Sequence, residues 1–370
     1  MSLPLRKFAE IGWVFGLKGD LVSAEPYGSG HINDTYLLVY SQAGTPMRYI
    51  LQRINNEVFH SIPNLMENIQ RVTEHIRVQL DAEAAKDCSR KVLTVLRQED
   101  GSTYFKDSGN SYWRIYYFIE GAVTYDKLEW PEQARAAAAA FGDFQKYLAG
   151  LSGPPLHDTI PDFHHTIKRF ERFNKVVAAD PLNRSKEAVK EIEGYRFFAD
   201  WYGLILNGLE RGDLPERVTH NDSKLNNVMI DNASGEGICV IDLDTVMKGS
   251  ALYDFGDLVR SATNAGMEDE ADPDKVFMRE DVFAAIVEGY LGQARSFLVP
   301  AEVELLAPAG LIITLEIGMR FLTDYIEGDV YFKKRRSGHN LDRARNQLLL
   351  AQSMHRKLDW MQTLVEGSAH

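Results

Sequence analysis

Residue types that can carry out phosphoryl transfer gather in one short segment, residues 220–227, and again at Asp242. Asp222 supplies a carboxylate that can orient an acceptor hydroxyl and accept its proton. Asn227 and Asp242 supply oxygen ligands that suit Mg²⁺, a hard cation that takes few protein ligands. Lys224 can neutralise charge on the transferring phosphoryl group. We therefore predict that Asp222 and Lys224 are catalytic and that Asn227 and Asp242 bind Mg²⁺.

Two apolar runs would position these side chains. Residues 228–230 and 238–241 flank the polar, glycine-bearing stretch 231–237, a pattern typical of a β-hairpin. Asn227 opens the first strand and Asp242 closes the second, so antiparallel pairing would place them side by side. Asp, Asn and Ser also favour ordinary turns. The second acid at hairpin spacing favours a site over a turn.

Residues 254–256 read Asp-Phe-Gly, the tripeptide that carries the metal aspartate in protein kinases. This tripeptide lies beyond a predicted break at residues 248–250, whereas Asp242 ends the partner strand of the hairpin. We therefore assign the metal to Asp242. Asp254 is expected to cap or brace a helix that begins near Phe255.

A β-rich first third of the chain precedes a helix-rich remainder. The apolar patterns predict strands and helices in the following ranges: strands over 21–25, 35–40, 47–54, 92–96, 102–105 and 112–118, and helices over 65–80, 131–148, 163–177 and 185–209, with several more after 252. This order predicts an α+β fold with a small β-rich lobe, residues 1–120, and a larger, mainly helical lobe, residues 121–370.

These motifs resemble the aminoglycoside phosphotransferase and choline kinase-like superfamily, whose members share the bilobal protein-kinase fold. Residues 28–36, 51–55, 220–227 and 241–246 are more narrowly similar to the N-acetylhexosamine 1-kinases. That resemblance implies transfer of the γ-phosphoryl group of ATP to the anomeric hydroxyl of N-acetylglucosamine or N-acetylgalactosamine. Kinases of choline, homoserine or aminoglycosides use the same scaffold and are the alternative.

The loop between the first two predicted strands carries two candidate functions. Gly28, Ser29 and Gly30 could bring backbone amides close to the phosphates of ATP, although a Gly-x-Gly turn is common in hairpins. His31 and Asp34 are either solvated turn residues or contacts to a polar acceptor. The resemblance to the hexosamine kinases favours the second interpretation.

The third predicted strand lacks the lysine that protein kinases use to hold the α- and β-phosphates. Arg53 is its expected substitute, although arginine and lysine differ in geometry. Glu67 on the following helix is the expected partner of Arg53, with Glu74 as second choice. In kinase-like folds the hinge, here Glu120, contacts adenine through its backbone, which the resemblance extends to this chain.

The C-terminal segment and Asp244 offer candidates for acceptor binding. Arg320 follows an apolar helix, where an unpaired charge would be costly, and the resemblance implies that Arg320 and Tyr331 contact the sugar. Asp324 lies four residues after Arg320 and could form a simple pair on the helix face. Asp244 could bind metal or sugar, or could cap the turn after its strand.

Composition excludes several classes of protein. The net charge of −12, with 41 basic and 53 acidic residues, argues against nucleic acid or an anionic membrane as partner. Two cysteines exclude a disulfide framework. The N-terminus lacks the apolar core of a signal peptide, and the apolar stretch 305–315 is too short to span a bilayer. We expect a soluble cytoplasmic protein that uses ATP, Mg²⁺ and a small sugar.

Overall fold

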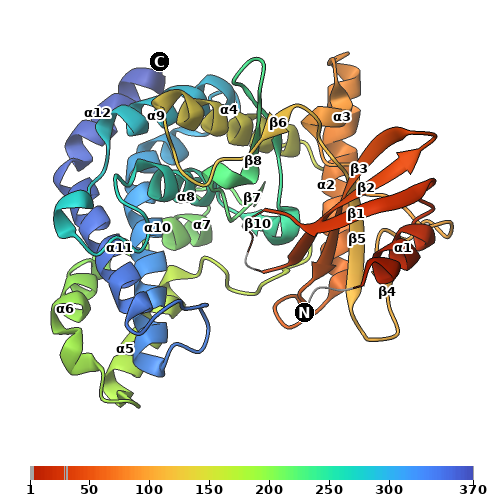
Figure 1. Cartoon of the computed structure of the whole chain (residues 1–370). Coiled ribbons are helices and arrows are strands. Elements are labelled where there is room, and N and C mark those ends of the chain that lie inside the picture. The colour runs from red at the N-terminus through yellow and green to blue at the C-terminus, as the bar shows by residue number, and fades with distance from the viewer. Residues whose placement is uncertain (1–3, 29, 31, 370) are drawn as a thin grey trace.

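The N-terminal part of the chain forms a five-stranded antiparallel sheet with the strand order β1-β2-β3-β5-β4. The structure is a computed structural model that describes residues 4–28, 30 and 32–369. Figure 1 shows this sheet at one end of the molecule and a large group of helices at the other. The predicted α+β fold with two lobes is confirmed. The strands are β1 Asp20–Pro26, β2 Asp34–Gln42, β3 Thr45–Ile54, β4 Phe105–Lys106 and β5 Tyr112–Tyr117.

Two long helices accompany this sheet. Helix α1, Leu5–Val14, buries Phe8 and Ile11 in the same apolar cluster as Leu38 and Leu51 of the sheet. Helix α2, Ile62–Ala82, has apolar residues at helical spacing, and its buried face joins the core of the C-terminal lobe. The helix predicted over 65–80 is therefore confirmed, whereas α1 was not expected.

Of the strands predicted for this region, the one over 92–96 is wrong and the one over 102–105 is shortened. Over residues 92–96 the only pairing in the described structure is an isolated bridge from Val95 to Tyr116. The strand predicted over 102–105 contracts to the two-residue β4. Periodicity cannot separate a short buried strand from other short apolar segments, which explains both errors. The short helix α3, Cys88–Lys91, precedes the bridge.

The C-terminal lobe is built from nine described helices. The helix predicted over 131–148 is confirmed as α4, while the one predicted over 185–209 is divided because a 3₁₀ turn at Ala199–Trp201 interrupts it. The helices are α4 Pro131–Leu148, α5 Thr166–Ala179, α6 Val189–Phe197, α7 Leu204–Arg211, α8 Ala251–Thr263, α9 Glu280–Ala294, α10 Pro300–Glu327, α11 His339–Arg356 and α12 Leu358–Ala369.

Helix α10 is the central helix of this lobe and packs against α5, α8, α11 and α12. It is long and apolar enough to cross a membrane by length and composition, yet 78% of its most apolar window is buried inside the molecule. At Gly256 on α8 the two backbones approach so closely that a Cβ would lie 2.6 Å from the carbonyl oxygen of Ala309. The apolar residues of α10 thus pack inside the core of the C-terminal lobe.

Two small sheets hold the loops that carry the candidate catalytic residues. Strands β6 Ala122–Val123, β8 Val228–Asp231 and β9 Gly237–Val240 form one, in the order β6-β8-β9. Strands β7 Arg217–Thr219 and β10 Met247–Gly249 form the other. Residues 220–227 connect β7 to β8, and residues 241–246 connect β9 to β10, so both loops run between the same two sheets. The proposed lobe boundary at residues 120 and 121 falls between β5 and β6.

Candidate active site

One carboxylate fixes the backbone of the catalytic loop. Asp254 of α8 is fully buried, and its two oxygens accept hydrogen bonds from the backbone amides of His220, at 2.9 Å, and Asn221, at 2.7 Å. Gln145 of α4 donates a third bond to Asp254, at 2.6 Å. Helix α8 begins at Ala251 with Ser250 as its cap, so Asp254 braces the loop and does not cap the helix. The prediction that Asp254 caps or braces a helix beginning near Phe255 is therefore wrong, because the helix begins at Ala251 and Asp254 binds the loop.

Two neighbouring side chains tie this loop to the loop that carries Asp242. The ring nitrogen Nε2 of His220 donates to the carbonyl oxygen of Ile241, at 2.9 Å. Asn221 has a positive φ of 65°, and its side-chain amide donates to the carbonyl of Thr245, at 3.0 Å. A left-handed conformation in a non-glycine residue persists only where surrounding contacts enforce it. The two loops therefore form one rigid unit.

The predicted hairpin is confirmed. Val228 of β8 pairs with Val240 of β9, and the backbone amide of Ile241 donates to the carbonyl of Asn227, at 2.9 Å. Asp242 follows immediately, with φ 60°, so the two predicted metal ligands lie at the same end of the hairpin. Both residues line the cleft between the lobes.

Beside Asn227, Asp222 and Lys224 form an ion pair with 2.9 Å between Oδ2 and Nζ. Burial alone would raise the pKa of Asp222, but the adjacent Lys224 ammonium holds it below its ordinary value. Asn227 donates from its side chain to the Asp222 carbonyl, at 2.8 Å, which fixes the turn between them. Asp222 is therefore an ionised carboxylate at neutral pH that can accept a hydroxyl proton.

Asp242 has the opposite electrostatic environment. Burial, together with the neighbouring charges of Asp244 and Asp222, raises its pKa to about 6. Two oxygen donors, Asn227 and Asp242, beside this concentration of negative charge fit a hard divalent cation such as Mg²⁺. The donor chemistry of the site is thus consistent with the predicted metal.

The glycine loop closes one side of the cleft. Tyr27, Gly28 and Gly30 line it, and Gly28 has φ 76° in open space, a conformation that favours glycine. Ser29 and His31, which were predicted to contact nucleotide and acceptor, lie outside the described residues.

The hinge differs from the prediction in its contacts. Phe118 and Ile119 line the cleft, whereas the Glu120 carbonyl accepts a hydrogen bond from Arg90, at 2.9 Å. The Glu120 side chain pairs with Arg48 on the exposed surface. The two residues just before Glu120 therefore line the cleft, and the backbone contact of Glu120 to adenine stays a prediction.

The predicted pairing of Arg53 with Glu67 is wrong. Arg53 and Asp34 are cross-strand neighbours on β3 and β2, and they form a half-exposed ion pair with Nε 2.8 Å from Oδ2. Glu67 instead contacts His157, at 3.0 Å, and Glu74 pairs with Arg97. Successive residues of a strand face opposite sides, and the cleft-facing residues of β2 and β3 are Thr35, Ile50 and Gln52. The structure thus places neither Arg53 nor Asp34 against the cleft.

Arg114 of β5 lines the cleft and was not singled out from the sequence. Its side chain is 1% exposed and forms a 2.5 Å ion pair with Asp244. Asn33 of the glycine loop donates to the second oxygen of Asp244, at 2.6 Å. Asp244 is therefore the counter-ion of a buried arginine, which differs from the roles of metal or sugar ligand and of turn cap. The sequence signal that could have identified Arg114 is a charged residue within an otherwise apolar predicted strand.

Arg320 and Tyr331 lie together, as predicted for a binding site. The Arg320 guanidinium lies 5.9 Å from the ring centroid of Tyr331 and 5.6 Å from that of Phe163. Glu316 lies 3.9 Å from Arg320 and contacts Nδ1 of His164, whose Nε2 donates to the Asn221 carbonyl at 2.9 Å. The suggested pair of Arg320 with Asp324 is absent among the described contacts. This cluster thus reaches the catalytic loop through His164.

Asp324 instead organises the following loop. Its buried carboxylate accepts hydrogen bonds from the backbone amides of Val330, Tyr331 and Phe332, at 2.8 to 3.0 Å, and from the Asn340 side chain. This single side chain fixes the position of Tyr331 relative to α10.

A second network of acids and arginines adjoins Asp222. Arg260 lies 2.7 Å from Asp257 and 3.1 Å from Glu268, and Arg343 also pairs with Glu268. Burial raises the pKa of Asp257, and the charge of Asp222 raises it further, which shows that the two carboxylates interact. Sequence spacing gave no signal for this network, because its members come from α8, α11 and the loop between α8 and α9.

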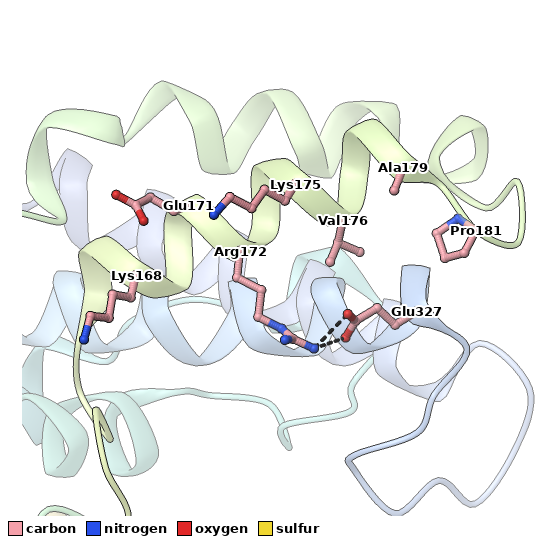
Figure 2. A pocket seen from close by; sticks show the side chains of 8 residues that line it. All are labelled: Lys168, Glu171, Arg172, Lys175, Val176, Ala179, Pro181 and Glu327. Carbon is pink, nitrogen blue, oxygen red and sulfur yellow. Dashed lines mark hydrogen bonds and ion pairs between the residues drawn. The ribbon is translucent and has the colours of Figure 1, made fainter.

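A further hollow, of about 620 Å³, lies along α5 and the end of α10. Figure 2 shows its charged lining, in which Arg172 pairs with Glu327. Figure 1 places α5 at the end of the helical lobe remote from the five-stranded sheet. This hollow is separate from the cleft that Asn227 and Asp242 line.

The fold and the cleft define a kinase-like phosphotransferase. A sequence model described as the phosphotransferase enzyme family (APH) matches residues 23–290, and the chain belongs to this family. The predicted superfamily is therefore confirmed.

Solved structures of small-molecule kinases share the fold at low sequence identity. A microcompartment-associated aminopropanol kinase aligns with a TM-score of 0.64 and 16% identity over 96% of this chain and 98% of its own. A choline kinase from Cryptosporidium parvum aligns with a TM-score of 0.54 and 15% identity over 93% and 92%. A spectinomycin phosphotransferase in complex with ADP and spectinomycin aligns with a TM-score of 0.54 and 12% identity over 97% and 99%.

Proposed function

We propose that this small-molecule kinase transfers the γ-phosphoryl group of ATP to the anomeric hydroxyl of an N-acetylhexosamine, GlcNAc or GalNAc, and releases the sugar 1-phosphate. The observation that carries the kinase activity is that Asn227 and Asp242 line one cleft, with the Asp222 carboxylate 3.4 Å from the Asn227 side-chain nitrogen. ADP in the related spectinomycin phosphotransferase supports ATP as the phosphoryl donor. Such a reaction would take place in the cytoplasm, where ATP is available.

The proposed chemistry is a direct in-line transfer. Asp222 orients the acceptor hydroxyl and accepts its proton while the hydroxyl oxygen attacks the γ-phosphorus. The bond from that phosphorus to the bridging oxygen of ADP breaks, and ADP leaves. Lys224, whose Nζ lies 2.9 Å from Oδ2 of Asp222, offsets negative charge on the transferring phosphoryl group. Asn227 and Asp242 would hold Mg²⁺, which neutralises phosphate charge when bound.

Charge balance on the acceptor side supports a neutral acceptor. Glu268 is paired with Arg260 and Arg343, and Glu316 with His164 and Arg320. A cationic acceptor such as choline needs carboxylates that are free of other partners, or aromatic faces that are free of other cations. A neutral sugar can instead form hydrogen bonds with guanidinium and carboxylate groups that are already paired. Arg320 beside Tyr331 is the proposed sugar contact.

The alternative is another small hydroxylated acceptor, such as choline, homoserine or an aminoglycoside. The aminopropanol and choline kinases that share the fold favour this alternative. It keeps every catalytic residue and changes only the acceptor side of the cleft.

A screen of acceptors decides between these functions. The purified protein with ATP and Mg²⁺ would be offered GlcNAc, GalNAc, choline, homoserine and kanamycin, and ADP release would be measured. We expect release with the N-acetylhexosamines. The methyl glycoside of GlcNAc is the matched control substrate, because it lacks the anomeric hydroxyl and should give no ADP.

The position of the phosphate completes this test. Phosphorus NMR should show a single anomeric phosphate, and the product should lose the reducing character of the free sugar. Faster turnover of choline or an aminoglycoside, or activity on the methyl glycoside, would contradict the proposed acceptor while leaving the kinase activity in place.

A further inference from the structure

Among the residues that the structure describes, the cleft face of the N-terminal sheet has no lysine. The side chains that β2, β3 and β5 present to the cleft come from Thr35, Ile50, Gln52, Arg114 and Tyr116. Gln52 and Arg114 lie directly opposite each other in the β3–β5 pairing. Arg114 is therefore the cation that this sheet presents to the cleft among its described residues.

Hydrogen bonds hold the Arg114 guanidinium in one orientation. Its Nε donates to Oε1 of Gln52, at 2.9 Å, and its Nη1 donates to Oδ1 of Asp244, at 2.5 Å. Gln52 is itself oriented, because its amide nitrogen donates to the Thr35 hydroxyl, at 3.0 Å. Nη2 has no partner among the described residues, so one edge of the guanidinium is available to a ligand.

The helix beside this sheet offers no acid to Arg114. The residue of α2 that contacts Arg114 is Met66, whose sulfur lies 3.9 Å from Nη1, while Glu67 turns to His157. In protein kinases a strand lysine pairs with a helix glutamate to hold the α- and β-phosphates. Here both members of the pair come from different elements, namely β5 and the loop after Asp242.

Asp244 connects this arginine to the glycine loop. Its second oxygen accepts from the Asn33 side chain, and the side-chain oxygen Oδ1 of Asn33 accepts from the backbone amide of Asn55, at 3.0 Å. The cation, the end of the glycine loop and the residue two positions after the metal ligand Asp242 thus share one carboxylate. These are the groups that surround the phosphates of a nucleotide in a kinase cleft.

We propose that Arg114 is the phosphate-binding cation of this kinase, with Asp244 as its counter-ion. The unpaired Nη2 of its guanidinium donates to oxygens of the α- and β-phosphates, while Gln52 and Asp244 hold Nε and Nη1 in place. This assignment rests on the proposed use of ATP and is independent of the acceptor. It also replaces Arg53, which faces the opposite side of the sheet.

Nucleotide binding without an acceptor tests the proposal. Isothermal titration of the full-length protein with adenosine, ADP and ATP would compare wild type with Arg114→Gln. Loss of charge-assisted hydrogen bonds should weaken ADP and ATP binding by about 10- to 100-fold. Adenosine has no phosphate, so its affinity should change less than about threefold. Arg97→Gln removes an exposed arginine of the same lobe and is the matched control.

Two further variants separate binding from folding. Arg114→Gln leaves Asp244 unpaired in a buried place, so the double variant Arg114→Gln/Asp244→Asn removes both charges and should fold with the same phosphate-dependent loss. Equal weakening of adenosine and ATP would overturn the proposal, because it would indicate a purely structural pair. A phosphate-dependent loss in Arg53→Gln with none in Arg114→Gln would also overturn it. If the wild-type protein binds no ATP, the proposed function itself fails.

Discussion

Asp242→Asn should stabilise the metal-free, nucleotide-free protein at alkaline pH while removing a proposed metal ligand. Burial and the charges of Asp244 and Asp222 raise the pKa of Asp242 from 3.8 to about 6. The folded state therefore binds a proton between these pH values that the unfolded state does not bind. Stability from this carboxyl is present below pH 4 and is lost as the pH rises through 6.

The size of the effect follows from the difference in pKa. About two pKa units correspond to about 3 kcal/mol. Although surrounding protein raises the pKa of the Asp242 carboxyl, its side chain still reaches solvent through the cleft, and screening by water should reduce the value to about 1 to 2 kcal/mol. For a chain of this length the unfolding temperature should rise by about 2 °C.

Thermal unfolding of both proteins between pH 4 and pH 8, in chelator, measures this difference. Asp242→Asn should unfold at higher temperature at pH 8, and the two curves should converge near pH 4. Mg²⁺ with ADP should reverse the order, since a ligand that binds the folded state stabilises it. Asp200→Asn, at an exposed position, is the control. Lower stability of Asp242→Asn at pH 8, or a difference that does not vary with pH, would refute the reasoning.

Three other substitutions probe the base, the core and the buried ion pair. Asp222→Ala should lower kcat by about 10²- to 10⁴-fold, measured as ADP release, with ATP affinity retained. Gly256→Ala should lower the free energy of unfolding by about 2 to 3 kcal/mol in urea, because its Cβ meets Ala309 at 2.6 Å. Glu316→Gln should cost about 3 kcal/mol by leaving His164 without its counter-ion.

Each of these substitutions has its own control or contrary result. Near-normal turnover in Asp222→Ala would show that Asp222 is not the catalytic base. Gly292→Ala, in a helix with open space around the glycine, should be neutral or slightly stabilising by comparison with Gly256→Ala. Unchanged urea stability in Glu316→Gln would mean that His164 is neutral in the folded protein.

The catalytic hairpin could be predicted from sequence because all its information is local. Asn227 and Asp242 are brought together by two adjacent strands and one turn, and the structure has that pairing. The helix over 131–148 was predicted for the same reason, since its apolar spacing is contained in the segment itself. Sequence patterns within single segments were therefore sufficient to predict that Asn227 and Asp242 lie together.

The cation of the cleft could not be predicted in this way. Arg53 and Gln52 are adjacent, and strands alternate their faces, so an error of one residue moves a side chain to the other side of the sheet. The pairing of Arg114 with Asp244 joins residues 130 positions apart. Asp254 likewise acts on a loop more than 30 positions earlier in the chain. No periodicity in a single segment carries such information.

The carboxylate of Asp324 has a consequence for how this scaffold changes its substrate. It gathers the backbone amides of residues 330–332, so the conformation of that loop depends on one α10 side chain more than on the identities of the loop residues themselves. Tyr331 and its neighbours can therefore be substituted together during evolution while the backbone conformation of the loop is kept. The hairpin bearing Asp242 is anchored elsewhere, through Asp254 and α8, and it would keep its geometry through every such exchange.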